Sequence, residues 1–181
     1  MIGIDIQKRS IQFARMENHQ LCSIAVVPAR SEENENESSR KVLRETVEKE
    51  GWRKKDVWCS VGGISIITHQ RSFPDMTGEE LASAVRLEAE QLISRPWHEM
   101  DFDYTKLGGE SGQATVMFAV TPRKLTEERF TDCRSADLYC NGITLNSLAT
   151  VEAFLNSADY SSEDDRALLV NVGSGQNTSI I

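Results

Sequence analysis

The segment Met76–Ile93 has the sequence MTGEELASAVRLEAEQLI and carries the clearest structural signal in the chain. Thr77 and Glu80 have the spacing of a capping box, in which each side chain accepts a hydrogen bond from the other residue's backbone N–H. Apolar residues then recur at helical spacing until Pro96. We therefore predict an amphipathic helix that stops at Pro96 and buries a face made of Ala82, Val85, Ala89, Leu92 and Ile93.

Short apolar runs lie on both sides of this helix. Val57–Val61 and Ile64–Arg71 precede it and are separated by two glycines. Phe102–Leu107 and Ala114–Val120 follow it and are joined by a glycine-rich connection. Runs of this length and composition, bounded by glycine or proline, predict strands.

A further helix is predicted from Pro122 to about Leu138. The order of helix, strand, strand and helix then indicates a small α+β subdomain over residues 74–140. We expect it to be inserted into a larger α/β body, of which residues 1–73 form the first part.

The N-terminal part of that body begins with three β-type runs, Ile2–Ile6, Ser10–Ala14 and Leu21–Val27. The polar residues between the first two runs predict a hairpin. Arg30–Ser39 is rich in Glu and Asn and predicts an exposed loop, and Arg40–Glu50 has the apolar spacing of a helix.

After the predicted insertion, residues 141–166 carry a short strand, a helix and an acidic loop. We expect them to close the first body. Residues 167–181 contain a strand, a Gly-Ser-Gly turn and the beginning of another strand. We expect this last stretch to start a second lobe that the chain leaves truncated.

The composition excludes several classes of function. The chain has 181 residues, of which 39% are hydrophobic, and its formal net charge is -8. An acidic chain is not drawn to nucleic acid or to anionic lipid. No apolar run has the length of a signal sequence or a membrane span. We expect a cytoplasmic protein with no nucleic-acid partner and no direct membrane insertion.

The sequence shows no metal-binding or catalytic motif. Four cysteines, Cys22, Cys59, Cys133 and Cys140, are scattered without the spacing of a zinc knuckle. They predict buried thiols. No Ser/His/Asp or Cys/His set has local support, so we assign no catalytic residue.

One scheme occurs twice: a strand, an acidic or amide residue, a turn and a hydroxyl residue. It is found in Ile4–Ser10, IDIQKRS, and again in Val170–Gln176, VNVGSGQ. Backbone N–H groups in such turns can bind phosphate, and a carboxylate at a strand end can hold Mg²⁺ through water. The alternative is an ordinary hairpin turn and an ordinary glycine turn. The candidate nucleotide-binding residues are Asp5, Gln7, Lys8, Ser10, Gln12, Asn171, Gly173, Ser174 and Gly175, with Asp5 also the candidate Mg²⁺ ligand.

Two such loops, separated by most of a domain, resemble the actin-like ATPase superfamily, whose fold is ribonuclease H-like. Within it the chain resembles the PilM family of type IV pilus assembly proteins. The similarity lies in the opening strand Met1–Ile6, the strand pair Val61–Arg71, the helix with its EEL and EAEQ motifs before Pro96, and the junction Ala119–Arg123. The resemblance implies an α/β, actin-like half with an inserted subdomain.

Three departures from the family pattern concern the nucleotide. Gln7 stands where the family commonly has glycine, Gln12 where it has lysine, and Asn171 where an aspartate is usual. The first crowds a turn, the second removes a cation and the third removes a carboxylate. The resemblance implies Mg–ATP as a cofactor, and these departures imply that its binding is weak or lost.

The resemblance also implies a function. PilM-like proteins are cytoplasmic adaptors, held at the inner membrane by the extended N-terminal tail of a PilN-like protein, which lies in a groove between body and insertion. Other pilus assembly components are further partners. We expect such a scaffold rather than an enzyme. The alternatives are an ATP-binding actin-like enzyme such as a sugar or acetate kinase, an FtsA-like cytoskeletal protein, and the related domain of a type II secretion or mannose-sensitive pilus system.

Overall fold

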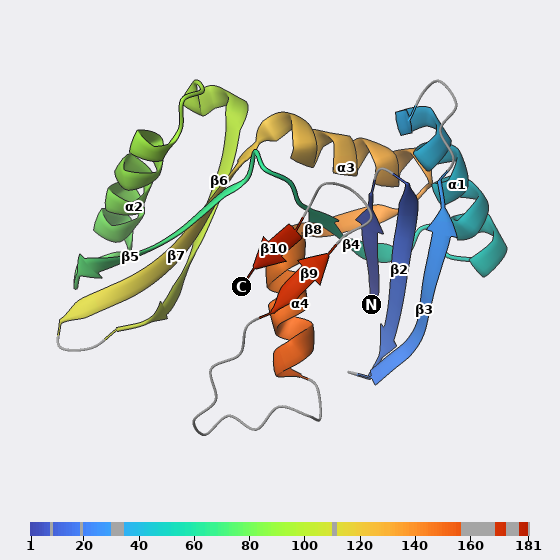
Figure 1. Ribbon diagram of the computed structural model, residues 1–181, viewed down its shortest axis with the longest axis horizontal. Coiled ribbons are helices and arrows are strands. Elements are labelled where there is room, and N and C mark those ends of the chain that lie inside the picture. Colours follow the sequence, from blue (N-terminus) through green and yellow to red (C-terminus); the bar gives the residue numbers. More distant parts are fainter. Residues whose placement is uncertain are drawn as a thin grey trace. The chain divides into compact units, whose positions relative to one another are not determined.

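The computed structural model describes residues 1–7, 9–18, 20–29, 35–109, 112–156, 169–172 and 178–180. The chain forms two compact units (Figure 1). Unit 1 comprises Met1–Gly62 and Glu128–Ile181, and unit 2 comprises Gly63–Glu127.

Unit 1 contains a five-stranded sheet in the order β3-β2-β1-β4-β8. The first three strands in the chain form an antiparallel meander, whereas β1, β4 and β8 run parallel to one another. The strands are β1 (Ile2–Ile6), β2 (Ser10–Glu17), β3 (Gln20–Pro28), β4 (Asp56–Val61) and β8 (Tyr139–Leu145). A separate antiparallel pair is formed by β9 (Val170–Val172) and β10 (Thr178–Ile180).

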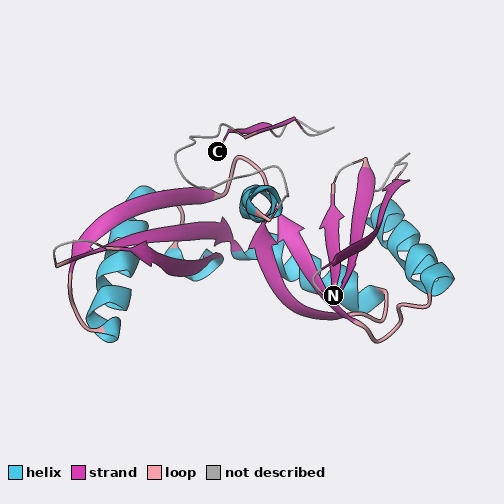
Figure 2. Cartoon of the chain, turned by 90° about the horizontal axis from the view of Figure 1, so that it is seen from below, coloured by secondary structure: helices cyan, strands magenta, loops and turns pink. Residues whose placement is uncertain are grey.

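The core of unit 1 lies on one face of this sheet. Alternate residues of β1 and β2 point into it, because successive side chains of a strand face opposite sides. Helices α1 (Glu35–Glu50) and α3 (Arg123–Ser135) share that core with the strands. Figure 2 views α4 (Asn146–Leu155) end-on, on the side of the sheet away from α3. The buried cluster is Ile2, Ile4, Ile11, Phe13, Leu43, Val47, Trp52, Val57, Cys59, Cys133, Ala136 and Leu138.

A buried carboxylate joins the two helices of this core. Asp132 on α3 is 6% exposed and accepts hydrogen bonds from Arg40 Nε at 2.8 Å and from Arg129 Nη1 at 2.6 Å. Arg40 belongs to α1. A buried charge is costly unless it is paired, and here both carboxylate oxygens have a charged partner.

Unit 2 is a three-stranded antiparallel sheet with one helix on it (Figure 1). Its strand order is β5-β7-β6. Apolar residues of the sheet, such as Val116, Phe118 and Val120, are in one buried cluster with the inward face of the helix. The elements are β5 (Ile67–Pro74), α2 (Gly78–Leu92), the short 3-10 helix η1 (Trp97–Glu99), β6 (Met100–Gly108) and β7 (Gln113–Pro122).

Helix α2 begins with the predicted capping box. The Thr77 side chain accepts from the Glu80 N–H, and a Glu80 carboxylate oxygen accepts from the Thr77 N–H at 2.9 Å. The buried face differs in part from the prediction. Leu81 is buried with Val85 and Ala89, whereas Leu92 is 40% exposed. The helix ends at Leu92, so Leu92 and Ile93, the last two residues of the predicted face, lie at and just beyond the end of the helix.

Unit 2 does not coincide with the predicted insertion over residues 74–140. Its start lies earlier because β5 pairs with β7 along its whole length and so belongs to the sheet of unit 2. Its end lies earlier because Cys133, Ala136 and Leu138 are buried in the core of unit 1.

Several element boundaries also differ from the prediction. Helix α1 begins at Glu35, inside the predicted loop, because the polar residues there extend a helix anchored by Leu43 and Val47. Helix α3 ends at Ser135, since Asp137 adopts a left-handed backbone with φ 58°. Strand β8 then begins at Tyr139, earlier than predicted.

Two positions in unit 1 allow unusually close packing. Gly142 on β8 lies opposite Trp58 on β4, and a Cβ at position 142 would be 2.3 Å from the indole ring. A Cβ at Gly62 would be 2.2 Å from the side-chain amide of Asn146. Separately, none of the helices in the described residues has the length and apolar character needed to cross a membrane.

Candidate functional site

The first predicted phosphate loop is the β1–β2 hairpin of unit 1. Asp5 is near the end of β1 and lies between Gln12 on β2 and Ser60 on β4 in the sheet register. Because cross-strand partners point to the same face, these three side chains form a row. β1 and β4 run parallel, so the row lies near their carboxyl ends, where ligands bind in open α/β sheets.

Both oxygens of the Asp5 carboxylate accept hydrogen bonds from its own chain. Gln7 Nε2 donates to one oxygen at 2.7 Å, and the Ser60 hydroxyl donates to the other in a short hydrogen bond. Ser60 is 8% exposed, so its hydroxyl is held inside the unit. The arrangement resembles an internal polar contact, in which each oxygen of a carboxylate accepts a hydrogen bond from a neutral donor.

The turn itself is closed by backbone bonds. The Gln7 N–H donates to the Ser10 carbonyl at 2.9 Å, and the Ala29 N–H donates to the Arg9 carbonyl at 2.9 Å. The structure therefore brings together Asp5, Gln7, Ser10 and Gln12 of the predicted loop. Lys8 lies outside the described residues.

The second predicted loop is described only in part. Asn171 lies in β9, where it pairs with Ser179 of β10. Gly173, Ser174 and Gly175 lie outside the described residues. The predicted meeting of the two loops around a phosphate thus stays a prediction.

Ser60 is a site residue that the sequence did not reveal. It belongs to an apolar strand, and its partner Asp5 is 55 positions away in the chain. The available signal was the register of parallel strands, which places a hydroxyl beside the carboxylate once β1 and β4 are paired.

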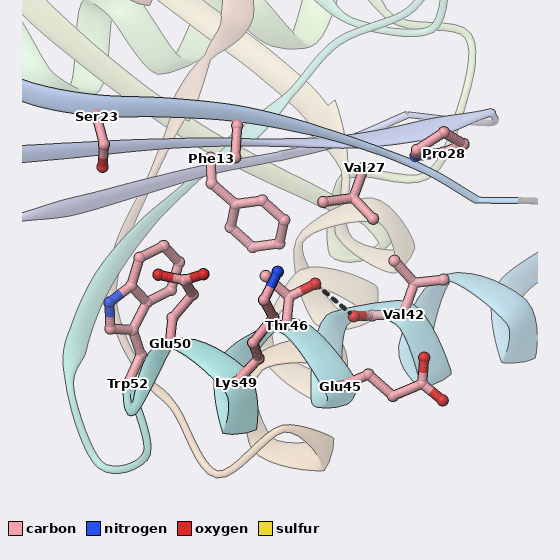
Figure 3. Close-up of a pocket in the computed structure, with 11 residues that line it drawn as sticks. Phe13, Ser23, Val27, Pro28, Val42, Glu45, Thr46, Lys49, Glu50 and Trp52 are labelled. Atoms are coloured by element: carbon pink, nitrogen blue, oxygen red, sulfur yellow. Dashed lines mark hydrogen bonds between the residues drawn. The ribbon is translucent and has the colours of Figure 1, made fainter.

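A cavity of about 520 Å³ lies on the other face of the same sheet, between β2, β3 and α1 (Figure 3). The rings of Phe13 and Trp52, with centroids 5.7 Å apart, are part of its lining. The Thr46 hydroxyl donates to the Val42 carbonyl at 2.9 Å, the dashed line in Figure 3. Glu45, Lys49 and Glu50 also line this cavity, so it mixes apolar walls with charges of both signs.

Three of the four cysteines meet in the core of unit 1. The Sγ atoms of Cys59, Cys133 and Cys140 all lie within 4.8 Å of one another. Cys59 and Cys133 are buried as predicted, whereas Cys140 is half-buried and Cys22 is exposed on the edge strand β3. The prediction that Cys22 is buried was wrong. Ser23, Ala25 and Val27 of β3 line the cavity beside α1, so Cys22 is on the opposite face of the strand, where Ile24 and Val26 are exposed too.

The shared hydrogen bonds of this cluster perturb its thiols. Hydrogen bonding to Cys133 and then to Cys140, together with burial, raises the pKa of Cys59. Hydrogen bonding from Cys133 and then from Cys59 lowers the pKa of Cys140. The half-buried thiol is thus the one that ionises first.

Comparison with solved structures identifies the fold. The chain is similar to the PilM–PilN type IV pilus biogenesis complex, with 22% identity and a TM-score of 0.72 over 85% of this chain and 50% of that one. It is also similar to the cytoplasmic domain of EpsL, an inner membrane component of the type II secretion system of Vibrio cholerae. There the identity is 12% and the TM-score 0.51, over 78% of this chain and 56% of that one.

A third structure, a Bacteroides thetaiotaomicron protein with an actin-like ATPase fold and unknown function, matches at 11% identity. Its TM-score is 0.46, over 84% of this chain and 54% of that one. The predicted α/β, actin-like fold is confirmed. The chain spans about half the length of these solved proteins.

No curated protein matches the chain. The family model described as type IV pilus assembly protein PilM matches residues 3–179, which is nearly the whole sequence. The resemblance inferred from the opening strand and the Met76–Ile93 helix is therefore confirmed. The chain belongs to the PilM family of type IV pilus assembly proteins.

Proposed function

We propose that this chain is an adaptor of the type IV pilus assembly machine that binds the N-terminal tail of a PilN-like inner-membrane protein and needs no nucleotide turnover. In this proposal it works in the cytoplasm and is held at the inner membrane by its partner. Extended tails are captured through backbone hydrogen bonds and side-chain pockets, so the task requires no catalytic residue.

The observation that carries the proposal is the internal engagement of Asp5. Mg²⁺ is bound through carboxylates and waters in near-octahedral geometry. Here one Asp5 oxygen accepts from Gln7 and the other from Ser60. A Mg²⁺ ion, or a water bound to it, would have to compete with the Gln7 amide and the Ser60 hydroxyl for these oxygens, which weakens the binding of a Mg²⁺–phosphate ligand.

Family membership supports the adaptor half of the proposal. The match to the PilM family covers residues 3–179. One of the similar solved structures is a complex of PilM with PilN. An adaptor without nucleotide turnover is consistent with this family membership and with the hydrogen bonds that Gln7 and Ser60 donate to Asp5.

Isothermal titration calorimetry tests both halves. The full chain is titrated with Mg–ATP and, separately, with a synthetic peptide of the cytoplasmic N-terminal tail of the PilN-like protein from the same organism. A peptide of identical composition in scrambled order is the matched control. We expect saturable binding of the tail peptide, none of the scrambled peptide, and no measurable heat from Mg–ATP.

The variant Gln7→Gly separates the two halves of the proposal. It frees one oxygen of Asp5 and should leave the affinity for the tail peptide unchanged. Tight binding of Mg–ATP by the unmodified chain, without binding of the tail, would overturn the adaptor function and favour an actin-like enzyme.

A further inference from the structure

Three elements of unit 1 bring their cysteines to one point. Cys59 belongs to β4 and Cys140 to β8, which are paired parallel strands. Cys133 belongs to α3, which packs on the same face of the sheet and shares its buried cluster with Cys59. The Sγ atoms of Cys59 and Cys133 are 3.2 Å apart. The backbone packing of three elements therefore determines these distances.

The cluster is enclosed except at one member. Cys59 and Cys133 are each 1% exposed, whereas Cys140 is half-buried. Cys140 is thus the member of the cluster that lies nearest to solvent. Among the described residues, the group contains no carboxylate and no imidazole. All its donors are soft thiols, which favour thiophilic ions over Mg²⁺ or Ca²⁺.

We propose that Cys59, Cys133 and Cys140 form a binding site for Zn²⁺, with a water molecule on the Cys140 side as the fourth ligand. Binding forms three Zn–S bonds to thiolates and releases to solvent the protons that the cysteines still hold, at most three, with no change of oxidation state. Three protein ligands and one open position are a known arrangement for this ion.

The distances agree with a tetrahedral site. A Zn–S bond of about 2.3 Å places the sulfurs of a tetrahedral centre about 3.8 Å apart. The Cys59–Cys133 separation of 3.2 Å is somewhat shorter than that value, and all three sulfurs lie within 4.8 Å of one another. Lengthening this one separation by about 0.6 Å gives the spacing of a tetrahedral centre. A divalent ion also balances two of the three thiolate charges, more than a monovalent ion would.

Cobalt(II) titration of the full, reduced chain tests this site, because tetrahedral cobalt thiolates absorb strongly. We expect a sulfur-to-cobalt charge-transfer band that saturates at one equivalent and disappears when one equivalent of Zn²⁺ is added. Cys140→Ser should weaken the binding of Co²⁺ more than about a hundredfold, since even the loss of a residue that only orients a ligand costs ten- to a hundredfold. Cys22→Ser is the matched control and should bind Co²⁺ as the unchanged chain does.

A second measurement uses only the unchanged chain, so a variant that fails to fold cannot affect it. The unchanged chain is treated with iodoacetamide with and without Zn²⁺, and labelling is followed by mass spectrometry. Cys22 should be labelled in both conditions, and Cys140 should be protected only when Zn²⁺ is present. Absence of the cobalt band in the unchanged chain, labelling of Cys140 regardless of Zn²⁺, or a well-folded Cys140→Ser chain with undiminished affinity would overturn the proposal.

Discussion

The two units differ in how their interiors are held together. In unit 2, α2 covers a three-stranded sheet through a cluster of apolar side chains such as Leu81, Val85 and Phe118. In unit 1, polar groups also lie in or beside the apolar core: Asp132 with its two arginines, and three cysteines. Ser60, also buried, bonds to Asp5 of the same unit.

The two units also differ in how far apart in the sequence the contacting residues lie. The capping box of α2 and the buried face of this helix involve residues close together in the sequence. Apolar residues at alternate positions of the strands complete the core of unit 2. The polar contacts of unit 1 join Ser60 to Asp5 and Arg40 to Asp132, residues 55 and 92 positions apart. The core of unit 2 is therefore specified by its apolar pattern, whereas the core of unit 1 also depends on specific polar pairs.

If pattern and burial alone stabilise unit 2, two chemically identical substitutions on α2 should differ strongly. Leu81 is 1% exposed and Leu92 is 40% exposed. Leu81→Ala should lower the free energy of unfolding by about 3 kcal/mol, because it leaves a cavity in the core. Leu92→Ala, the control, should lower it by less than about 1 kcal/mol. Urea denaturation followed by circular dichroism measures both, and equal losses would contradict the described packing of α2.

Specific pairing in unit 1 is tested by a substitution that keeps volume and removes charge. Asp132→Asn should cost about 2 kcal/mol, because the side chain of Arg129, 16% exposed, loses its charged partner. Asp137→Asn is the control, since its ion pair with Arg53 is largely exposed and should contribute less than about 1 kcal/mol. If both variants unfold at the same urea concentration as the unchanged chain, the stability of unit 1 does not depend on the contact between Asp132 and Arg129.

The smallest effect is expected at the start of α2. Thr77→Ala removes the cap and should cost about 1 kcal/mol, whereas Thr77→Ser keeps the hydroxyl and should cost less. Hydrogen bonds from the Thr77 backbone and then its side chain lower the pKa of Glu80 below its ordinary value of 4.5.

A lowered pKa in the folded state has a defined consequence for stability. The contribution of Glu80 is present above its unfolded pKa and is lost as the pH falls through its folded pKa. The difference in melting temperature between the unchanged chain and Glu80→Gln should therefore exist at pH 7 and shrink in acid below about 4.5. A difference that is constant from pH 7 to pH 3 would contradict the described capping box.

Local signals in the sequence predicted most elements of the fold. Thr77 and Glu80 marked the start of α2, and the family resemblance placed the chain in an actin-like half. The boundaries that differ depend on tertiary contacts or backbone geometry. Leu81 joins the buried face because the sheet lies against that side of the helix, and α3 ends early because Asp137 turns the backbone.

The candidate site was predictable in its residues but not in its contacts. Asp5 and Gln7 were identified from the hairpin pattern, yet only the fold shows that the Gln7 amide bonds the Asp5 carboxylate. Ser60 and the cysteine cluster had no local signal, because strand pairing and helix packing bring them together. The sequence shows which side chains are available, and the topology decides which of them meet.

The contact between Gly142 and Trp58 has a consequence for the history of the chain. Any side chain at position 142 would collide with the indole, at 2.3 Å from its Cβ. A larger residue there requires the indole, which is 46% exposed, to rotate away or position 58 to accept a smaller side chain. We therefore expect these two positions to covary across the lineage.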